Sequence, residues 1–397
     1  MGQRHKPHSG SKAFYPRKRA KSETPSFRSA KATPGVVRAR AAGDAKGGET
    51  TGSKPLTFLA YKAGMVHIIG TDAHKGGIKF GKPVSLACTV VECPPMRVFG
   101  VRAYKKANYG IEAAVDVLVD KPDKSLHRKM KNLKKAVSKK KKERQAYKNM
   151  AEIEAIKDSV KELRLLAHAN PGLTGIGKKK PEISEIMLSG SVDEQFAYAK
   201  GALGNDIKAA DLFEKDTFVD IKAVDKGKGT TGIVKRFGTK THRHKAKHPR
   251  ILGSLGPWTP STVMWTVPRA GQHGYQTRTE LNKRVLAVGN NPAEINPSAG
   301  FKNYGVVRND YLVLAGSIPG PAKRCVAIRG AIRPYNENQN KISDILFISS
   351  KAPAGKHPYA MKAREAAPAK AEKKEAPKKE AKKEVKKEAP KKKEAKK

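Results

Sequence analysis

The sequence has little cysteine and no long apolar run, and each shortage excludes a class of protein. Cys88, Cys93 and Cys325 are its only cysteines. They are too few and wrongly spaced for a disulfide framework or a zinc knuckle, so we expect them to pack in a core in a reducing compartment. No stretch of about eighteen apolar residues is present, and the N-terminus lacks the apolar centre of a secretory signal. These absences predict a cytosolic protein with no membrane contact.

Acidic residues are also scarce. The 397 residues include 36 Asp and Glu against 82 Lys and Arg, a formal net charge of +46. A compact free monomer with this charge would repel itself strongly, so we expect a permanent polyanionic partner, for which nucleic acid is the obvious candidate. The hydrophobic content of 38% is too low for the whole chain to form a core, which predicts one or two domains with segments outside them.

The positive charge is most concentrated between Lys222 and Gly289. This stretch has fourteen Lys and Arg against two acids, Asp225 and Glu280. Its Gly, Pro, Thr and His leave no apolar periodicity from which a helix or an independent core could form. We therefore predict a long basic loop, held at both ends by strands, that does not fold by itself.

Aromatic rings interrupt the cations of this stretch. Such rings can stack on unpaired bases, so the composition favours RNA over a membrane surface. Trp258 lies between Gly256-Pro257 and Thr259-Pro260, a tight-turn sequence, so we expect its ring at a loop tip rather than in a small core. Trp265 has apolar neighbours and is expected to pack at the base of the loop.

The string GSLGPWTPSTVMWTVPRAGQHGYQTRTELNKR, residues 253–284, closely resembles the central finger of the universal large-subunit ribosomal protein three family, in its archaeal and eukaryotic form. The resemblance covers roughly residues 6–350. It implies an α+β fold: an antiparallel, translation-factor-like β-barrel with an inserted α-rich subdomain, a long basic central finger loop and extended N- and C-terminal tails. Departures from the family pattern are residues 31–52, a short lysine-rich insert and the C-terminal tail.

The family resemblance also implies a function. It indicates a structural constituent of the large ribosomal subunit that binds and organises large-subunit ribosomal RNA, supports early subunit assembly and reaches toward the peptidyl transferase centre, with Trp258 at the finger's end. The expected partners are that RNA and neighbouring large-subunit ribosomal proteins, and the expected place is the cytoplasm. Near the N-terminus, AFYPRKRAK (Ala13 to Lys21) resembles the extension that threads into ribosomal RNA. A nuclear-localisation signal is the alternative for this cluster.

The residues expected to bind RNA are cations for phosphates and bases, with rings and amides that stack or donate hydrogen bonds. They do not include a nucleophile with a general base and a residue that positions that base. We therefore expect no catalytic residue, cofactor, metal or small-molecule substrate. The set comprises Arg17, Lys18, Arg19, Lys226, Lys228, Lys235, Arg236, Arg243, Lys245, Lys247, Arg250, Trp258, Arg269, Gln272, His273, Tyr275, Arg278, Lys283 and Arg284.

The domain organisation follows from changes in local composition and hydrophobic pattern along the chain. Short β-branched runs bounded by Gly, Pro and Asp predict antiparallel strands on both sides of a central insert. The expected division is a basic N-terminal extension (1–52), the first part of the barrel (53–121), the α-rich insert (122–212), the second part of the barrel with the finger at 222–289 (213–350), and a Lys/Glu/Ala/Pro tail (351–397).

The insert is expected to begin with helix. Residues 122–168 show a helical period, and the string MAEIEAIKDSVKELRLLAHA from Met150 has an apolar stripe that should pack on the body. The cationic first half could cover RNA or face solvent, and both remain open for Lys139 to Lys142.

Two motifs have the residue spacing of nucleotide-binding and zinc-binding sites. Gly227 to Gly232 matches the spacing of a dinucleotide-binding turn, but the following IVKRF is β-prone and no acid lies about twenty residues on, so we expect a turn that approaches an RNA phosphate. His242, His244 and His248 have the spacing of zinc ligands. Cations surround them and no acid is near, which favours RNA contacts over a metal.

Two rival functions remain open at this point. An RNA-modifying enzyme with a basic clamp would need a cofactor pocket, and the sequence offers no acid or Cys set to line one. A chromatin-like DNA condenser would prefer duplex DNA to structured RNA, which a competition at several salt concentrations distinguishes.

Overall fold

The computed structural model describes residues 15–27, 53–119, 122–131, 150–334 and 341–349. Within these ranges the chain is mostly β-strand with few helices, and its sheets are antiparallel, as expected for the α+β class. The expectations for most of the N-terminal extension, for Lys139 to Lys142 and for the C-terminal tail lie outside the described residues. No helix in the described ranges is long and apolar enough to span a membrane.

The central body is a sheet that closes on itself. Its strands follow the order β13-β8-β11-β12-β2-β1, and β1 pairs again with β13. β14 (Ile342–Ile348) pairs with the far end of β1, outside this ring. The six ring strands are β1 (Thr57–Asp72), β2 (Pro83–Glu92), β8 (Phe218–Val224), β11 (Thr277–Gly289), β12 (Tyr311–Ala315) and β13 (Cys325–Gly330).

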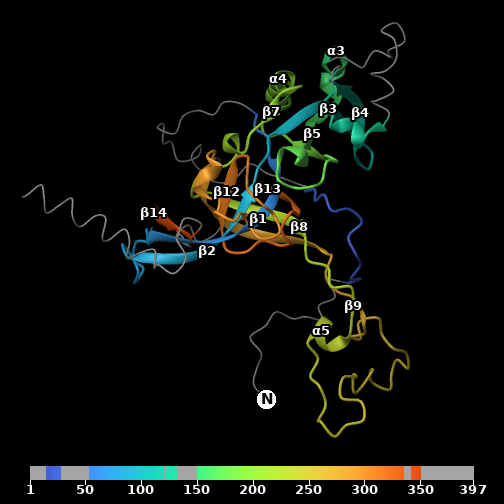
Figure 1. The fold of residues 1–397 in the computed structure, drawn as a ribbon. Helices are drawn as coiled ribbons and strands as arrows, with labels where there is room; N and C mark the ends of the chain where they lie inside the picture. The colour runs from blue at the N-terminus through green and yellow to red at the C-terminus, as the bar shows by residue number, and fades with distance from the viewer. Residues whose placement is uncertain (1–14, 28–52, 120–121, 132–149, 335–340, 350–397) are drawn as a thin grey trace, which may run out of the picture.

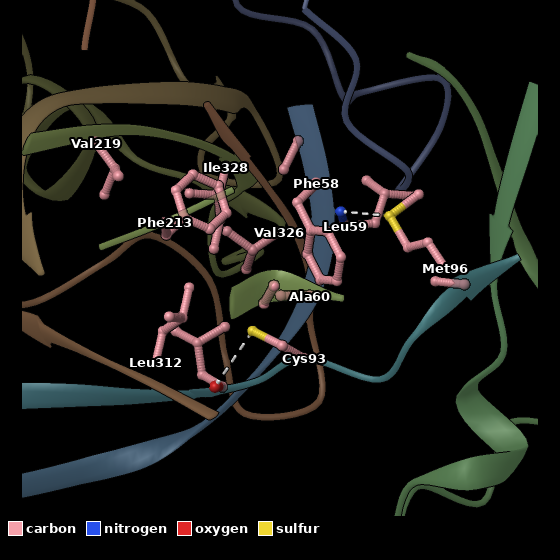
Figure 2. Packing of buried hydrophobic residues seen from close by; sticks show 14 of the residues in the cluster. Phe58, Leu59, Ala60, Cys93, Met96, Phe213, Val219, Leu312, Val326 and Ile328 are labelled. Atoms are coloured by element: carbon pink, nitrogen blue, oxygen red, sulfur yellow. Dashed lines mark hydrogen bonds between the residues drawn. The ribbon is translucent and has the colours of Figure 1, made fainter. Parts of the chain in front are cut away.

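The interior of the closed sheet is apolar, as Figure 2 shows. Phe58 meets Phe213 edge to face at a centroid distance of 6.5 Å, and aliphatic residues from β8, β12 and β13 surround the pair. The register shift after Lys62 bends β1 at Gly64, where a Cβ would lie 2.4 Å from the ring of Phe301.

All three cysteines are buried free thiols, so the core role expected for them is confirmed. Burial raises the pKa of the Cys88 thiol to about 12 and that of Cys325 further. Neither thiol ionises near neutral pH, which removes the thiolate that redox or nucleophilic chemistry requires.

A second sheet is inserted between β2 and β8 (Figure 1). Its order is β4-β3-β5-β6, with β7 paired to β3. Helix α4 (Val192–Ala202) packs on β5 and starts with a capping box between Ser191 and Glu194. The remaining elements are β3 (Met96–Ala107), β4 (Gly110–Leu118), α3 (Met150–Ala155), β5 (Val160–Ala169), β6 (Glu182–Met187) and β7 (Asp206–Ile207). Short 3-10 turns lie at Leu126–Arg128, Lys157–Ser159, Pro171–Leu173, Ala209–Asp211 and Pro292–Glu294.

Residues 160–168 of the helix expected over residues 122–168 form a strand instead, while residues 132–149 of that range lie outside the described residues. In the described part of that range, Lys131 and α3 are helical and short 3-10 turns are present, but Val160–Ala169 is a strand between β3 and β6. The apolar residues of VKELRLLAHA suit a strand because both faces are covered: Leu163 and Leu165 face the main core, while Leu166 packs with Phe99 and Leu126. β3 and β4 pair in the same sheet as β5 and β6, so this part of the chain is built on a sheet.

Candidate nucleic-acid interface

The basic stretch leaves the closed sheet between Val224 and Thr277, which pair with each other. Residues 225–276, here called the basic loop, are therefore shorter than the 222–289 expected from sequence, because both flanks of that stretch are ring strands. Figure 1 shows the loop extending away from the body. A two-residue ribbon of β9 (Thr230–Thr231) and β10 (Gly271–Gln272) closes its base, followed by α5 (Ile233–Phe237).

The outer part of the basic loop exposes many cations and the indole ring of Trp258. Every residue from 240 to 250 is exposed, including Arg243, Lys245, Lys247 and Arg250. Trp258 is 93% exposed, in a turn where Ser261 N–H donates to its carbonyl at 2.9 Å. The ring is therefore exposed in a turn, in keeping with the flanking prolines, and its π-face is available for stacking.

An aromatic cluster occupies the base of the loop. Tyr15 lies 6.2 Å from Phe237 and 5.2 Å, edge-on, from Trp265. The guanidinium of Arg17 covers the Phe237 ring at 4.4 Å, and the side chain donates to the carbonyl of Arg236 at 3.3 Å. Trp265 thus contacts the base through Tyr15, but it is 63% exposed, so the packing expected for it is only partial.

Arg236 holds the two sides of the base together. Its Nε donates to the carbonyl of Gln272 at 3.0 Å and its Nη1 to that of Arg269 at 2.8 Å. Burial, with the charge of Arg17, lowers the pKa of this guanidinium, which nevertheless stays protonated. Two of the N–H donors of Arg236 therefore bind carbonyl groups of the protein itself.

Residues 15–27, here called the strap, hold Tyr275. The Tyr275 hydroxyl donates to Glu23 at 2.6 Å, and Ala20 N–H donates to the Tyr275 carbonyl at 2.8 Å. The guanidinium groups of Arg19 and Arg324 lie 4.8 and 5.2 Å from its ring centroid. Arg324 also forms an ion pair with Glu23 at 2.8 Å. The ring expected to stack on RNA is occupied by protein groups.

The strap continues across both sheets. Thr24 donates a hydrogen bond to Glu182, a buried carboxylate at the start of β6. Lys222 donates to the carbonyl of Ser26 at 2.6 Å, and the guanidinium of Arg329 covers the Phe27 ring at 4.4 Å. The part of the N-terminal extension that the structure describes is thus packed on the body.

His273 and Gln272 shape the glycine-rich turn. His273 exchanges backbone hydrogen bonds with Lys228 and Gly229, each 2.9 Å long, and its Nδ1 lies 3.1 Å from the Thr231 hydroxyl. Burial and the charges of Lys228 and Arg17 lower the pKa of His273, so the ring is neutral at neutral pH. Gln272 Nε2 donates to the carbonyl of Gly274 at 2.9 Å.

Contrary to expectation, helix follows the glycine-rich turn. Residues 233–237 form the single helical turn α5, which ends at Gly238 in the left-handed region. A glycine at each end permits this turn because Gly232 serves as N-cap and Gly238 takes the C-cap conformation that other residues disfavour. The β-propensity of IVKRF is overridden by these caps and by packing of the buried Phe237.

The cations of β11 are used within the protein. Arg284 is only 3% exposed; its Nη1 lies 3.3 Å from Asp216 and its guanidinium 4.6 Å from the Phe218 ring. Lys283 pairs with Glu280 at 2.8 Å and Arg278 with Asp225 at 3.2 Å. Arg284 is thus buried in the protein, whereas Arg278 is exposed.

The candidate interface has two parts. The residues brought together at the base are Arg17, Arg19, Arg236, Gln272, His273 and Tyr275. The outer loop holds Arg243, Lys245, Lys247, Arg250 and Trp258, and further exposed cations near the base are Lys18, Lys226, Lys228, Lys235 and Arg269. In the described ranges, no group of three or more His, Cys, Asp or Glu residues, His242, His244 and His248 included, could hold a metal ion.

Sequence reasoning missed Glu23 and Arg324, which complete the contacts of Tyr275. Glu23 carried a signal, because it is one of three acids in the first 52 residues and lies beside the aromatic-basic cluster. Arg324 carried none, since its proximity to Tyr275 arises from the pairing of β13 and β11 with β8.

Comparison with known proteins gives a consistent result. The family described as "Ribosomal protein L3" matches residues 1–353. "Large ribosomal subunit protein uL3" of Methanothrix thermoacetophila is 42% identical over 356 residues, covering 88% of this chain and 98% of the relative. The proteins of the same name from Archaeoglobus fulgidus and Methanocaldococcus jannaschii are 40% and 41% identical, each over 357 residues. These alignments cover 89% and 88% of this chain, and 99% and 98% of the relatives.

Proposed function

Since this chain belongs to the ribosomal protein L3 family, and is therefore a structural constituent of the large ribosomal subunit rather than an enzyme, we propose that its basic loop penetrates large-subunit ribosomal RNA. Membership implies that the protein binds this RNA beside other ribosomal proteins, in the cytoplasm. The expected function is thereby shown at the level of the subunit, and the RNA-modifying enzyme has no support. The individual contacts are our proposal.

The observation that carries the proposal is the exposure of Trp258 on a loop whose residues 240–250 are exposed and include no Asp or Glu. Its neighbours at residues 240–250 have no packed core to hold them and carry several positive charges. Phosphates can neutralise Arg243, Lys245 and Lys247 while an unpaired base stacks on the indole. In the family to which the chain belongs, the corresponding tip lies near the peptidyl transferase centre, and we assign that place to Trp258.

We assign the base of the loop a different role. Arg17, Arg236 and Tyr275 hold the loop against the body through the contacts described above. Lys18, Lys226, Lys228 and Lys235 remain exposed around them and would bind RNA phosphates. The closed sheet corresponds, in this proposal, to the translation-factor-like barrel of the family, with the second sheet and α4 as its insert. We extend the role of the bound protein to early subunit assembly, where charge neutralisation lets RNA helices approach.

The test measures RNA affinity of the full-length chain carrying Arg243→Gln, Lys245→Gln and Lys247→Gln, using a large-subunit ribosomal RNA transcript. Each lost phosphate contact should reduce the slope of log K against log salt by about 0.7 to 0.9, so the triple variant should lose roughly two units. The control carries Lys161→Gln, Lys200→Gln and Lys208→Gln, which remove equal charge within residues 150–215, where acids outnumber bases. Equal slopes in both variants would refute the loop as the binding element.

A further inference from the structure

The end of the β1–β2 hairpin, residues 73–82, has features that the closed sheet does not require. β1 pairs with β13 over Thr57–Tyr61, whereas Ile68–Asp72 pair with β2 and with β14 beyond the ring. Figure 1 shows this hairpin projecting from the body well away from the basic loop. A partner that binds the hairpin end would therefore contact a different part of the protein from one that binds the basic loop.

Main-chain hydrogen bonds make most of the contacts that shape this turn. Asp72 N–H donates to the Lys82 carbonyl at 3.0 Å, and Gly81 N–H donates to the Asp72 carbonyl at 2.9 Å. Inside it, Phe80 N–H donates to the Gly77 carbonyl at 3.0 Å. Ala73 N–H donates to the carbonyl of Lys341, which ties the turn to the start of β14. Because main-chain groups carry the shape, the side chains of the turn are available to a partner.

Those side chains are predominantly cationic. Lys75, Lys79 and Lys82 are exposed, as is the neighbouring Lys341. Among the described residues, none of these ammonium groups has a carboxylate within ion-pair distance. The Asp72 carboxylate instead accepts from His74 N–H at 2.9 Å. With Asp344 as the other nearby acid, the surface keeps an excess of positive charge that complements phosphates.

Two apolar side chains stand among these lysines. Ile78 is 96% exposed and Phe80 is 53% exposed. Apolar groups at a hairpin tip, next to cations, fit a partner that offers both phosphates and flat or sugar faces. A neighbouring protein could cover the two apolar side chains. It would not supply the phosphates that these lysines can bind.

We propose that residues 73–82 form a second RNA-binding site, separate from the basic loop. Lys75, Lys79 and Lys82 bind phosphates, and Phe80 packs on an unpaired base or a ribose. This inference rests on the proposed function, since it takes the RNA to be that of the large subunit. The site gives the protein a second hold on the RNA, at a distance from the one at Trp258.

A photocrosslink identifies what the hairpin touches. Full-length protein with p-benzoylphenylalanine in place of Ile78 is assembled into large subunits and irradiated. We expect a crosslink to ribosomal RNA. A crosslink to protein alone, or none, overturns the proposal. A parallel sample with the crosslinker in place of Trp258 separates the two ideas: RNA crosslinked at 258 but not at 78 refutes the hairpin site only.

Binding measurements supply the second test. In the full-length chain, Lys75→Gln, Lys79→Gln and Lys82→Gln together should reduce the salt slope for a large-subunit ribosomal RNA transcript by roughly two. Phe80→Ala should weaken binding roughly tenfold with the slope unchanged. The variant with Lys161→Gln, Lys200→Gln and Lys208→Gln is the matched charge control. An unchanged slope in the hairpin variant, with thermal unfolding also unchanged, contradicts the proposal.

Discussion

The Tyr275 hydroxyl donates a 2.6 Å hydrogen bond to the carboxylate of Glu23, a residue 252 positions earlier in the chain. This bond joins the strap to the end of the basic loop, just before β11 begins. Arg324 lies against both partners. The loop therefore leaves the body in a direction that three separate segments determine.

Tyr275→Phe should loosen the strap without unfolding the body. The variant keeps the ring beside Arg19 and Arg324 but loses a hydrogen bond to a charged acceptor. Because the Glu23 side chain is half-exposed, the expected loss in free energy of unfolding is at most about 1 kcal/mol. Limited proteolysis should cut the strap faster, while denaturant unfolding changes little. Glu23→Gln retains an acceptor for Tyr275 but removes the charge that pairs with Arg324, so it should loosen the strap at least as much.

The same carboxylate predicts a dependence on pH. The hydrogen bond from Tyr275, assisted by the charges of Arg324 and Lys178, lowers the pKa of Glu23 below its ordinary 4.5. A lowered pKa means that this contribution to stability is complete above pH 4.5 and is lost as the pH falls through the folded-state value. Protection of the strap from protease should decline over that acid range in the parent protein. In Tyr275→Phe the decline should be shallower.

Gly274 should tolerate no side chain. Its φ is +75°, and a Cβ would lie 2.2 Å from the carbonyl oxygen of Lys226. Gly274→Ala therefore combines left-handed strain with a backbone clash, and we expect it to lower the free energy of unfolding by about 2 to 4 kcal/mol. Gly229 also has a positive φ, of +64°, but open space around its Cα. Gly229→Ala is the matched control and should cost only about 1 to 2 kcal/mol. Equal losses would exclude the clash as the cause.

Arg284 and Arg243 should behave in opposite ways. Arg284→Met leaves Asp216 without its ion pair, and since that carboxylate is partly exposed we expect a loss of about 1 to 3 kcal/mol in the free energy of unfolding. RNA affinity of the folded fraction should keep its salt slope. Arg243→Met should leave stability within about 0.5 kcal/mol and reduce the slope by about one. A reduced slope in Arg284→Met would contradict the buried position.

Particular residues show how far sequence alone reaches. The flanking prolines place Trp258 at a turn, and the strands on either side of the basic loop follow from their β-branched runs, because both signals are local. Leu163 and Leu165 suit a helix or a strand equally, and only the pairing of β5 with β3 and β6 decides between them. Arg284 looks like every other cation of its stretch until tertiary packing buries it. Local patterns locate the loop, whereas long-range pairing decides which of its cations are available.

Trp258→Ala should affect function much more than stability. The ring is almost fully exposed at a turn that Ser261 closes through backbone and hydroxyl bonds to the residue 258 carbonyl, bonds that alanine retains. The free energy of unfolding should therefore change by less than about 0.5 kcal/mol. If the indole stacks on RNA near the catalytic centre, its loss removes about 1 to 3 kcal/mol of local contact and should alter tRNA accommodation or the response to drugs that bind there. Ribosomes carrying Trp258→Ala are compared with ribosomes carrying Trp258→Phe, which keeps a stacking ring. Normal translation and normal drug sensitivity in the alanine variant would show that the tip does not reach that centre.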